Sequence, residues 1–343
     1  FRFQLKTGGT GNETAGRVIQ GGRGIYLIQT GLEQFQWGDL SGRFYFEVSG
    51  SQDFPTVGDW VVYSAIENSG RVLIQRVLTR QSYLQRKVAG VGVESQALGA
   101  NIDTVFVLSS ANAEFNLRRL ERYFVLCRES SVKFVLVLTK TDLATEDEIG
   151  EIKNFVQKEY PEVPIVEVSV LTNVGLNELQ IYFKSGETVC LLGSSGVGKS
   201  SLVNHLLERS ALKTQSVRES DAKGRHTTSE RHMFLLPEGG VIIDTPGMRE
   251  LQLSDHGGGL SSTFDDVESL SLKCRFSNCT HSVEPGCMIQ QCIRDGSLSS
   301  GRWASYQKML REVAYQKQRV SKSLAHKERR NFKANKKRFQ DYS

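Results

Sequence analysis

The sequence lacks any apolar run that approaches the length of a membrane span, which excludes a protein that crosses a bilayer as an apolar helix. We therefore expect no membrane partner. The sequence also lacks an initiator methionine, since it begins at Phe1, so the natural N-terminus is expected to have been trimmed or processed. A cytoplasmic location is expected, and an organellar one stays open because a targeting peptide can have been removed.

Cysteine is scarce and unevenly placed. Of six cysteines, Cys127 and Cys190 stand alone in apolar runs, where they are expected to be buried core thiols. The other four lie in one short segment near the C-terminus. Disulfides are disfavoured in the cytoplasm, so this segment favours metal binding over bridging.

Length and composition set wide limits. A chain of 343 residues has room for two or three domains, each with its own core. Its 39% hydrophobic and 24% charged residues are the proportions of an ordinary soluble globular protein, and we expect a monomer. The net charge of +5 is small, but positive residues gather at the C-terminus.

Residues 1–82 have the pattern of an all-β domain. Segments 43–48, 59–63 and 71–78 are rich in β-branched and aromatic residues, and glycine-bearing turns separate them. Several short strands of this kind predict a small barrel. Five strands would suit an OB-fold, which commonly binds nucleic acid. An SH3-like barrel without nucleic-acid contacts stays open, because periodicity does not separate the two.

Residues 83–253 alternate between strands and helices, which predicts an α/β domain with a mostly parallel sheet covered on both faces. Two helices have capping signals: Asn116 before the first, and a capping box of Thr145 and Glu148 before the second. Ligands of such sheets bind at the carboxyl ends of the strands. The strands are expected at 104–108, 134–138, 163–168 and 188–192, a short helix at 176–183, and the apolar helix faces at Leu117, Leu120, Phe124 and Cys127, then Ile149, Ile152, Phe155 and Val156.

A glycine-rich stretch follows the last of these strands. It reads Gly193-Ser194-Ser195-Gly196-Val197-Gly198-Lys199-Ser200 and matches G-x-x-x-x-G-K-[S/T], the phosphate loop, with a helical pattern from Ser201 onward. Glycines let backbone N–H groups surround phosphate at the positive end of that helix. Lys199 can reach the β- and γ-phosphates, and the Ser200 hydroxyl can bind Mg²⁺. A chance glycine-rich turn is the alternative, but strand, loop and helix in register favour a nucleoside triphosphate site.

The strand at 134–138 is followed by a motif that can read a base, Thr139-Lys140-Thr141-Asp142, which fits [N/T]-K-x-D. The aspartate can accept hydrogen bonds from guanine N1 and N2, which adenine cannot supply, so such a site rejects the wrong base. After the next strand, Ser169 and Val170 stand where a backbone N–H can contact guanine O6. Either segment can instead be an ordinary polar turn.

Residues 241–247 predict a strand that ends in D-x-x-G. Asp244 can hold a Mg²⁺-bound water, and the Gly247 N–H can contact the γ-phosphate. In the polar segment before this strand, Thr227 or Thr228 can supply a hydroxyl to Mg²⁺ and a carbonyl to the γ-phosphate, as a switch segment does. A plain strand and turn is the alternative.

Hydrolysis needs a group that orients water, and many GTPases place glutamine directly after the D-x-x-G motif. Here that residue is Met248, which cannot orient water. His226 is the nearest candidate for this catalytic role, since an imidazole near neutral pKa can polarise water. A solvated loop histidine without a role is the alternative.

The motifs come in an unusual order. In ordinary GTPases the phosphate loop comes first and the base-reading aspartate late, whereas here Thr139 precedes Gly193 by about 50 residues. The same sheet forms if the chain is circularly permuted, because termini that lie close in space can be exchanged for an internal break. The switch region and Asp244 then join directly to the segment that follows, so their movement on hydrolysis can pull on it.

That following segment contains the four clustered metal-ligand side chains, Cys274-x4-Cys279-x-His281-x5-Cys287. Three thiolates and one imidazole are a complete tetrahedral set for one structural Zn²⁺. The ion would hold together a segment too short to build its own core. Cys292 is a fifth candidate, either as an alternate ligand or as a spare thiol.

Residues 254–343 as a whole are expected to form a mainly helical domain with a basic tail. One helix face is marked by Trp303, Tyr306, Leu310 and Val313. A solvated helix face or a disordered tail is the default for a charge run, but beside a barrel and a zinc module the phosphates of nucleic acid are the more economical partner. From Lys317 to Arg338 the tail has only one acidic residue, Glu328, against Lys317, Arg319, Lys322, Lys327, Arg329, Arg330, Lys333, Lys336, Lys337 and Arg338.

In combination these motifs resemble the RsgA family, also called YjeQ, which are circularly permuted GTPases of small ribosomal subunit biogenesis. The resemblance implies an N-terminal OB-fold, a central permuted GTPase and a zinc domain. It further implies binding to the small ribosomal subunit and its rRNA near the decoding region, GTPase activity stimulated there, and release after hydrolysis. It also supports His226 as the water-orienting residue. The chain departs from the family pattern in Thr139, where asparagine is usual, and in its long basic tail.

The sequence therefore predicts a Mg²⁺-dependent GTP hydrolase that binds GTP and GDP and acts in late maturation of the small ribosomal subunit. Two alternatives stay open. A phosphate-loop ATPase would hydrolyse ATP and GTP at comparable rates. An RNA-binding nucleotide switch without significant hydrolysis would show negligible turnover even with small subunits present.

Overall fold

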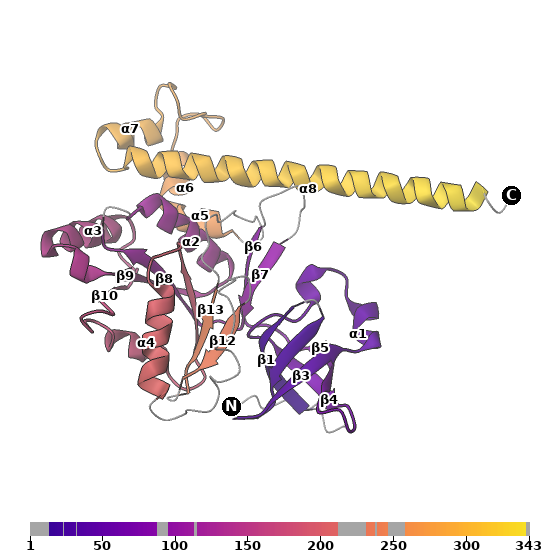
Figure 1. Ribbon diagram of the computed structural model, residues 1–343. Coiled ribbons are helices and arrows are strands. Elements are labelled where there is room, and N and C mark those ends of the chain that lie inside the picture. Colours follow the sequence, from indigo (N-terminus) through magenta and orange to yellow (C-terminus); the bar gives the residue numbers. More distant parts are fainter. Residues whose placement is uncertain are drawn as a thin grey trace.

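The computed structural model describes residues 14–22, 24–31, 33–87, 95–112, 115–211, 231–236, 239–245 and 258–340. At 208–211, 320 and 322–340 only the backbone is described. Three parts follow one another along the chain: a barrel, a central sheet with its helices, and a helical part that ends in one long helix (Figure 1). Among the residues described, no helix is both long enough and apolar enough to cross a membrane.

Five strands close the N-terminal barrel. Their order is β1-β2-β3-β5-β4, with β3 and β5 parallel and the other neighbours antiparallel, including β1 with β4. Val18, Ile28 and Ile74 are fully buried inside it, because alternate residues of each strand point inward. The closed five-stranded barrel confirms the predicted OB-fold class. The strands are β1 (Thr14–Gly22), β2 (Ile25–Gln29), β3 (Phe35–Leu40), β4 (Trp60–Ala65) and β5 (Val72–Val77).

The strand expected at 43–48 is wrong, because this segment belongs to the helix α1 (Gly42–Glu47) between β3 and β4. The Ser41 hydroxyl accepts a hydrogen bond from the Phe44 N–H at 3.1 Å and caps the helix. Phe44 is buried in the barrel core, whereas Phe46 is 92% exposed. Aromatic residues suit strands and helices alike, so the cap and one buried ring decide the local structure.

The central sheet has six strands in the order β10-β9-β8-β11-β13-β12. All neighbouring pairs are parallel except β12 with β13, which confirms the predicted α/β class. The strands are β8 (Thr104–Ser110), β9 (Lys133–Thr139), β10 (Ile165–Val168), β11 (Thr188–Gly193), β12 (His232–Leu235) and β13 (Val241–Asp244).

Helices cover both faces of this sheet. One face packs against α2 (Leu117–Glu129) and α3 (Glu146–Glu159). The other face packs against α4 (Lys199–Ala211) and a 3₁₀ helix, Glu178–Tyr182. A hairpin of β6 (Tyr83–Lys87) and β7 (Ser95–Ala100) connects the barrel to the sheet (Figure 1).

The predicted caps of the two helices on the first face are confirmed. The Asn116 side chain accepts a hydrogen bond from the Arg119 N–H at 3.1 Å, and Thr145 and Glu148 form a complete capping box. The expected apolar faces are buried at most positions. Phe155 is an exception, at 46% exposed, because the helix turns it beyond the edge of the core.

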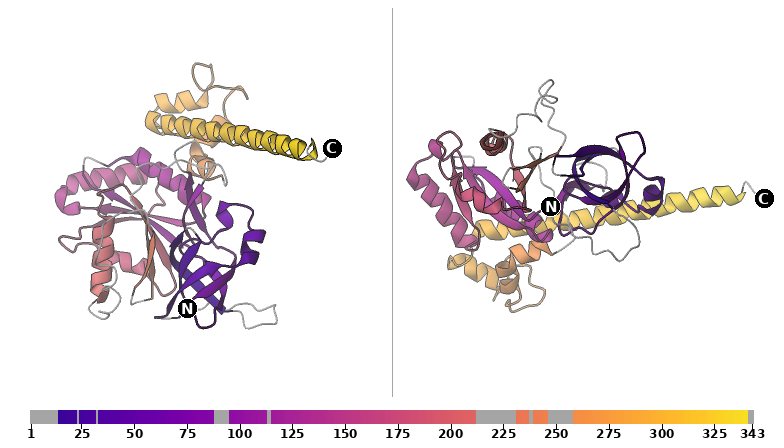
Figure 2. Two further views of the ribbon diagram at one scale, coloured as in Figure 1. Left: turned by 45° about the vertical axis from the view of Figure 1, so that its right-hand side comes forward. Right: turned by 90° about the horizontal axis from the view of Figure 1, so that it is seen from below.

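The C-terminal part consists of α5 (Gly259–Thr263), α6 (Asp265–Ser271), α7 (Met288–Arg294) and α8 (Ser300–Gln340). The long α8 crosses over the central domain and continues past it on the side of the barrel (Figures 1 and 2). Of its expected apolar face, Val313 is buried and Trp303 and Tyr306 are half-buried. Leu310 is 46% exposed, and its neighbour Met309 is buried in its place.

A buried cluster of polar side chains joins α8 to the central domain. Arg302 donates to both carboxylate oxygens of Asp266, at 2.7 and 2.6 Å, and to the Tyr160 hydroxyl at 2.6 Å. The Tyr160 hydroxyl in turn donates to Glu121 at 3.2 Å, and the Ser305 hydroxyl donates to the same carboxylate. Glu121 is completely buried, so its charge depends on these partners.

We predict that Arg302→Met lowers the free energy of unfolding by about 3 kcal/mol, because it leaves buried acceptors without their donor. The midpoint of urea denaturation measures the change. Arg128→Met is the matched control, since Arg128 pairs with Glu162 at the surface and such pairs contribute little. Equal midpoints for the two variants would contradict the prediction.

Candidate functional site

The carboxyl ends of the parallel strands bring the separate sequence motifs to one edge of the sheet. β11 ends at Gly193, where the glycine-rich stretch begins, and its neighbour β13 ends at Asp244. On the other side, β8 separates β11 from β9, which ends at Thr139. β10 is next to β9 and ends at Val168. This edge is where an open α/β sheet binds ligands.

The glycine-rich stretch turns sharply before α4, which begins at Lys199. Gly198 has a φ of +104°, a conformation that favours glycine, and a Cβ at Gly193 would lie 2.7 Å from the Leu108 carbonyl oxygen. The Lys199 Nζ donates to the carbonyls of Gly193 and Ser194, at 2.8 Å each. Burial lowers the pKa of Lys199, while the charge of Asp244 opposes this. The loop therefore holds the desolvated Lys199 ammonium, whose positive charge would attract an anion.

Thr139 links the base motif to this loop. Its hydroxyl is buried and lies 2.6 Å from the Val197 carbonyl oxygen, to which it donates. Threonine can therefore make a side-chain contact to the loop from the position where the family pattern has asparagine. The bond joins two segments 58 residues apart in sequence.

Asp142 lies in a 3₁₀ turn, Thr141–Leu143, directly after Lys140, which has a left-handed φ of +58°. The Ser169 hydroxyl donates to one Asp142 carboxylate oxygen at 2.6 Å. Ser169 is itself buried and paired through its backbone with Val174. The two segments expected to surround a base are thus in direct contact, and the Asp142 side chain stays exposed to a ligand.

Asp244 has the character of a cation ligand. Its Oδ1 is buried and has no hydrogen-bond partner among the residues described. Burial raises the pKa of Asp244, while the charges of Lys199 and His232 and the Thr245 N–H oppose this. The next side chain is fixed, since the Thr245 hydroxyl donates to the Leu191 carbonyl at 2.7 Å. An unpartnered carboxylate oxygen beside the phosphate loop suits Mg²⁺, which prefers oxygen ligands.

Four predicted site residues lie outside the described part of the chain: His226, Thr227, Thr228 and Gly247. Met248 lies outside it as well. Ser200 and Ser201 are described and exposed at the start of α4. Val170 is half-buried against the core beside the 3₁₀ helix.

The C-terminal part holds a second candidate site. The ligand atoms of Cys274, Cys279, His281 and Cys287 all lie within 4.8 Å of one another. His281 Nδ1 is 3.4 Å from Cys274 Sγ and 3.7 Å from Cys287 Sγ. The Met288 N–H donates to Cys274 Sγ at 3.4 Å, a contact that favours a thiolate. Donors at such separations can bind one tetrahedral metal ion.

Neighbouring side chains hold the histidine of this cluster in place. His281 has a left-handed φ of +59°, and Gln290 donates to its carbonyl at 2.7 Å. The Trp303 ring of α8 packs edge-on against the imidazole, with 5.4 Å between ring centroids. Cys292 is not one of the four clustered residues; it is buried in the apolar core on α7.

None of the sequence motifs marks an aromatic patch that lies on the outside of the barrel. Phe35 and Trp37 on β3 and Ile25 on β2 are 43%, 45% and 47% exposed. Alternation in the sequence could have shown this, since Phe35 and Trp37 lie on one side of β3, while Gly38 and Leu40 on the opposite side are buried. Exposed aromatic rings on such a barrel can stack on nucleic-acid bases.

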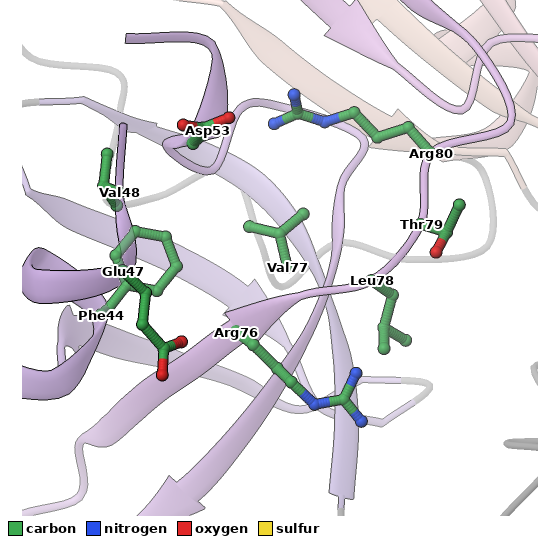
Figure 3. A pocket seen from close by; sticks show the side chains of 9 residues that line it. All are labelled: Phe44, Glu47, Val48, Asp53, Arg76, Val77, Leu78, Thr79 and Arg80. Atoms are coloured by element: carbon green, nitrogen blue, oxygen red, sulfur yellow. The ribbon is translucent and has the colours of Figure 1, made fainter. Parts of the chain in front are cut away.

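A cavity of about 350 Å³ also lies on the barrel, between α1, β5 and the chain that follows β5 (Figure 3). Glu47, Asp53, Arg76 and Arg80 line it together with apolar side chains. None of its lining residues belongs to the motifs at the sheet edge or to the cysteine cluster. The cavity therefore takes no part in the site.

Comparison with known proteins identifies the family. A sequence model described as RsgA GTPase matches residues 77–254. A relative from Vibrio parahaemolyticus, "Small ribosomal subunit biogenesis GTPase RsgA 2", is 44% identical over 92% of this chain and 84% of its own. The chain belongs to the RsgA GTPase family. A second RsgA relative, from Oceanobacillus iheyensis, is 40% identical over 92% of this chain and 90% of its own.

Solved structures agree with this membership. The crystal structure of YjeQ from Thermotoga maritima aligns with a TM-score of 0.64 at 25% identity, covering 88% of this chain and 99% of that one. The structure of YloQ, titled a circularly permuted GTPase, shares the fold with a TM-score of 0.59 at 22% identity, covering 90% of this chain and 98% of that one. As an RsgA GTPase, the protein is an enzyme that hydrolyses GTP to GDP and phosphate.

We predict that Asp244→Asn stabilises the nucleotide-free RsgA chain by roughly 0.5–1 kcal/mol at neutral pH. The folded-state pKa of Asp244 is raised, so its ionised form is the costly one in the folded protein. The amide removes that cost. As pH falls below the pKa of an unfolded aspartate, the unaltered protein binds the proton in both states and the gain should vanish.

Thermal denaturation of both forms at neutral and acidic pH measures this gain. A lower Tm for the variant at neutral pH would show that the carboxylate stabilises the fold, contrary to the prediction.

Proposed function

We propose that this protein hydrolyses GTP during late maturation of the small ribosomal subunit, binds the rRNA of that subunit, and leaves it after hydrolysis. The observation that carries the proposal is the bond from Thr139 to the Val197 carbonyl, which sets the base motif against the phosphate loop. Relatives named for small ribosomal subunit biogenesis support the biological setting. Such a role needs no membrane and suits a monomer in the cytoplasm.

Guanine is the proposed base. Asp142 would accept hydrogen bonds from guanine N1 and N2, and the Ser169 hydroxyl would hold the carboxylate in that orientation. Lys140 and Thr141 would support the base from the same turn, and the Val170 segment would supply a backbone N–H to O6. Adenine would leave the carboxylate without donors, so the site would discriminate against ATP.

The phosphates are proposed to bind in the loop from Gly193 to Ser201. Backbone N–H groups of the loop would hold the β- and γ-phosphates together with the Lys199 ammonium, which donates to two loop carbonyls in this structure. Mg²⁺ would supply charge neutralisation, with Ser200 and Asp244 as its protein side. Thr227, Thr228 and Gly247 are proposed to complete the contacts to the ion and the γ-phosphate.

We propose that the barrel and α8 bind RNA, and that a metal ion stabilises the C-terminal part. Zn²⁺ is the proposed metal of the cysteine cluster, because three thiolates and one imidazole in a closed set are typical of structural zinc. The aromatic patch of the barrel and the basic half of α8 are the proposed rRNA contacts. The proposed domain limits are 1–82, 83–253 and 254–343.

One experiment tests the function: GTP and ATP hydrolysis with and without purified small ribosomal subunits, for the unaltered protein and for Asp142→Asn. We predict GTP turnover that subunits stimulate, and little ATP turnover. Asp142→Asn should lose preference for GTP over ATP by a factor on the order of 10² or more. Asp147→Asn, a change of an exposed carboxylate on α3, is the control and should keep the preference.

Comparable ATP and GTP turnover in the unaltered protein would favour the ATPase alternative. Negligible turnover even with subunits would favour the nucleotide switch.

We further predict that His226→Ala reduces turnover about 10²-fold while the affinity for GTP stays within about twofold, since a water-orienting group acts on the chemical step. Single-turnover hydrolysis measures the step, and fluorescent nucleotide titration measures the affinity. His232→Ala, a change of the neighbouring histidine on β12, is the comparison variant. Unchanged turnover in His226→Ala would remove this residue from the mechanism.

A further inference from the structure

A buried arginine of the barrel reaches into the central domain. Arg17 on β1 is only 6% exposed, and its guanidinium lies over the Trp60 ring at 5.4 Å. Its Nε donates to the Gly58 carbonyl at 3.3 Å within the barrel. One of its terminal nitrogens donates to two groups outside the barrel, the Asn101 carbonyl at 3.2 Å and the Thr188 hydroxyl at 2.8 Å. A desolvated cation with these acceptors holds a fixed position.

Thr188 is the first residue of β11, the strand that ends in the phosphate loop. It is buried, and each of its polar groups has a partner: the hydroxyl accepts from Arg17, the N–H donates to the Asp103 carboxylate at 2.7 Å, and the carbonyl accepts from the Asp103 N–H at 2.9 Å. Every residue of β11 is buried. A strand held on both sides by β8 and β13 moves as a unit, so a shift at Thr188 reaches Gly193.

The barrel also packs against the strand of the proposed Mg²⁺ ligand. The turn at Gly58 has a φ of +92°, and a Cβ there would lie 2.1 Å from the Ala100 carbonyl oxygen and 3.2 Å from Ile243 Cδ1. Ile243 is fully buried and directly precedes Asp244 on β13. The Ala100 N–H donates to the Val57 carbonyl at 3.0 Å, which closes the joint. Both strands that carry phosphate-site residues therefore contact the same end of the barrel.

We propose that Arg17 is a positioning residue that couples the barrel to the phosphate loop through Thr188 and β11, so that RNA bound on the barrel changes the rate of GTP hydrolysis. The inference rests on the proposed function, since it explains how subunit binding reaches the nucleotide. Burial lowers the pKa of Arg17 to about 10, and the charges of Asp103 and Asp59 oppose the shift, which agrees with a desolvated cation between two domains.

Two variants test the coupling. Thr188→Val removes the hydroxyl that accepts from Arg17 while keeping the volume of the side chain, and Arg17→Gln removes the cation. Arg43→Gln is the matched control, an exposed arginine of the barrel that pairs with Glu47 on its own helix. For each full-length protein, GTP turnover is measured alone and with saturating small subunits, together with GDP affinity and Tm.

We expect both coupling variants to keep basal turnover and GDP affinity within about twofold and to lose at least about fivefold of the stimulation factor, the lower end of typical coupling between sites. Arg43→Gln should keep the full factor. Full stimulation at saturation in Thr188→Val overturns the coupling, whether or not Arg17→Gln folds. An equal fall of basal and stimulated turnover overturns it too, since that marks a merely structural role. Absence of stimulation in the unaltered protein overturns the proposed function itself.

Discussion

The hydrogen bond from the Thr139 hydroxyl to the Val197 carbonyl is the contact on which the proposed nucleotide site depends. It holds the turn that contains Asp142 against the loop that contains Lys199, although the two lie far apart in sequence. The sheet brings these two segments close together, because its strands are parallel here and β9 is separated from β11 only by β8. All three strands therefore end at the same edge. The motifs therefore meet at one edge of the sheet although their order in the sequence is permuted. The order of a sheet is set by strand pairing in space, and connectivity can vary around it.

Two groups of opposite charge, Lys199 and Asp244, interact at the carboxyl edge of the sheet. The Lys199 ammonium donates to two loop carbonyls, and the buried Asp244 Oδ1 has no hydrogen-bond partner among the residues described. Burial lowers the pKa of Lys199 and raises the pKa of Asp244, because it disfavours the charged form of each group. The charge of each group opposes the shift of the other. Cations and phosphate would satisfy both groups at once. Charged groups that are buried at a cost in stability are common where a protein binds charged ligands.

Local chemistry made part of this structure predictable. The phosphate loop, the base motif and the four metal-ligand residues lie within short segments whose spacing follows from the chemistry. The caps at Asn116 and Thr145 depend on neighbours three residues away, so they too can be predicted from the sequence. The strand expected at 43–48 is wrong because aromatic residues do not distinguish strand from helix, whereas the Ser41 cap starts a helix there.

Contacts between distant segments were not predictable. Arg17 and Arg302 each look like an ordinary surface arginine in sequence, yet both are buried, one between the barrel and β11 and one between α8 and the central domain. No local pattern marks them, because their partners come from chain segments that only the fold brings near. The predicted burial of Leu310 and Phe155 is wrong for a related reason. Helical periodicity predicts the apolar face of a helix, but not where the neighbouring element that covers it ends.

Buried cations thus contribute to both joints of the chain, beside an apolar cluster that extends from the central domain into α5, α6, α7 and α8. A buried, paired charge is sensitive to the loss of any partner, so each of these pairings depends on the relative position of the two parts that it joins.

A crystal structure of the complex with GDP and Mg²⁺ tests the central claim most directly. The account predicts one nucleotide with its guanine edge on the Asp142 carboxylate and its β-phosphate on the Lys199 ammonium, spanning the bond between Thr139 and Val197. A nucleotide that occupies the loop with its base turned away from Asp142 would contradict it.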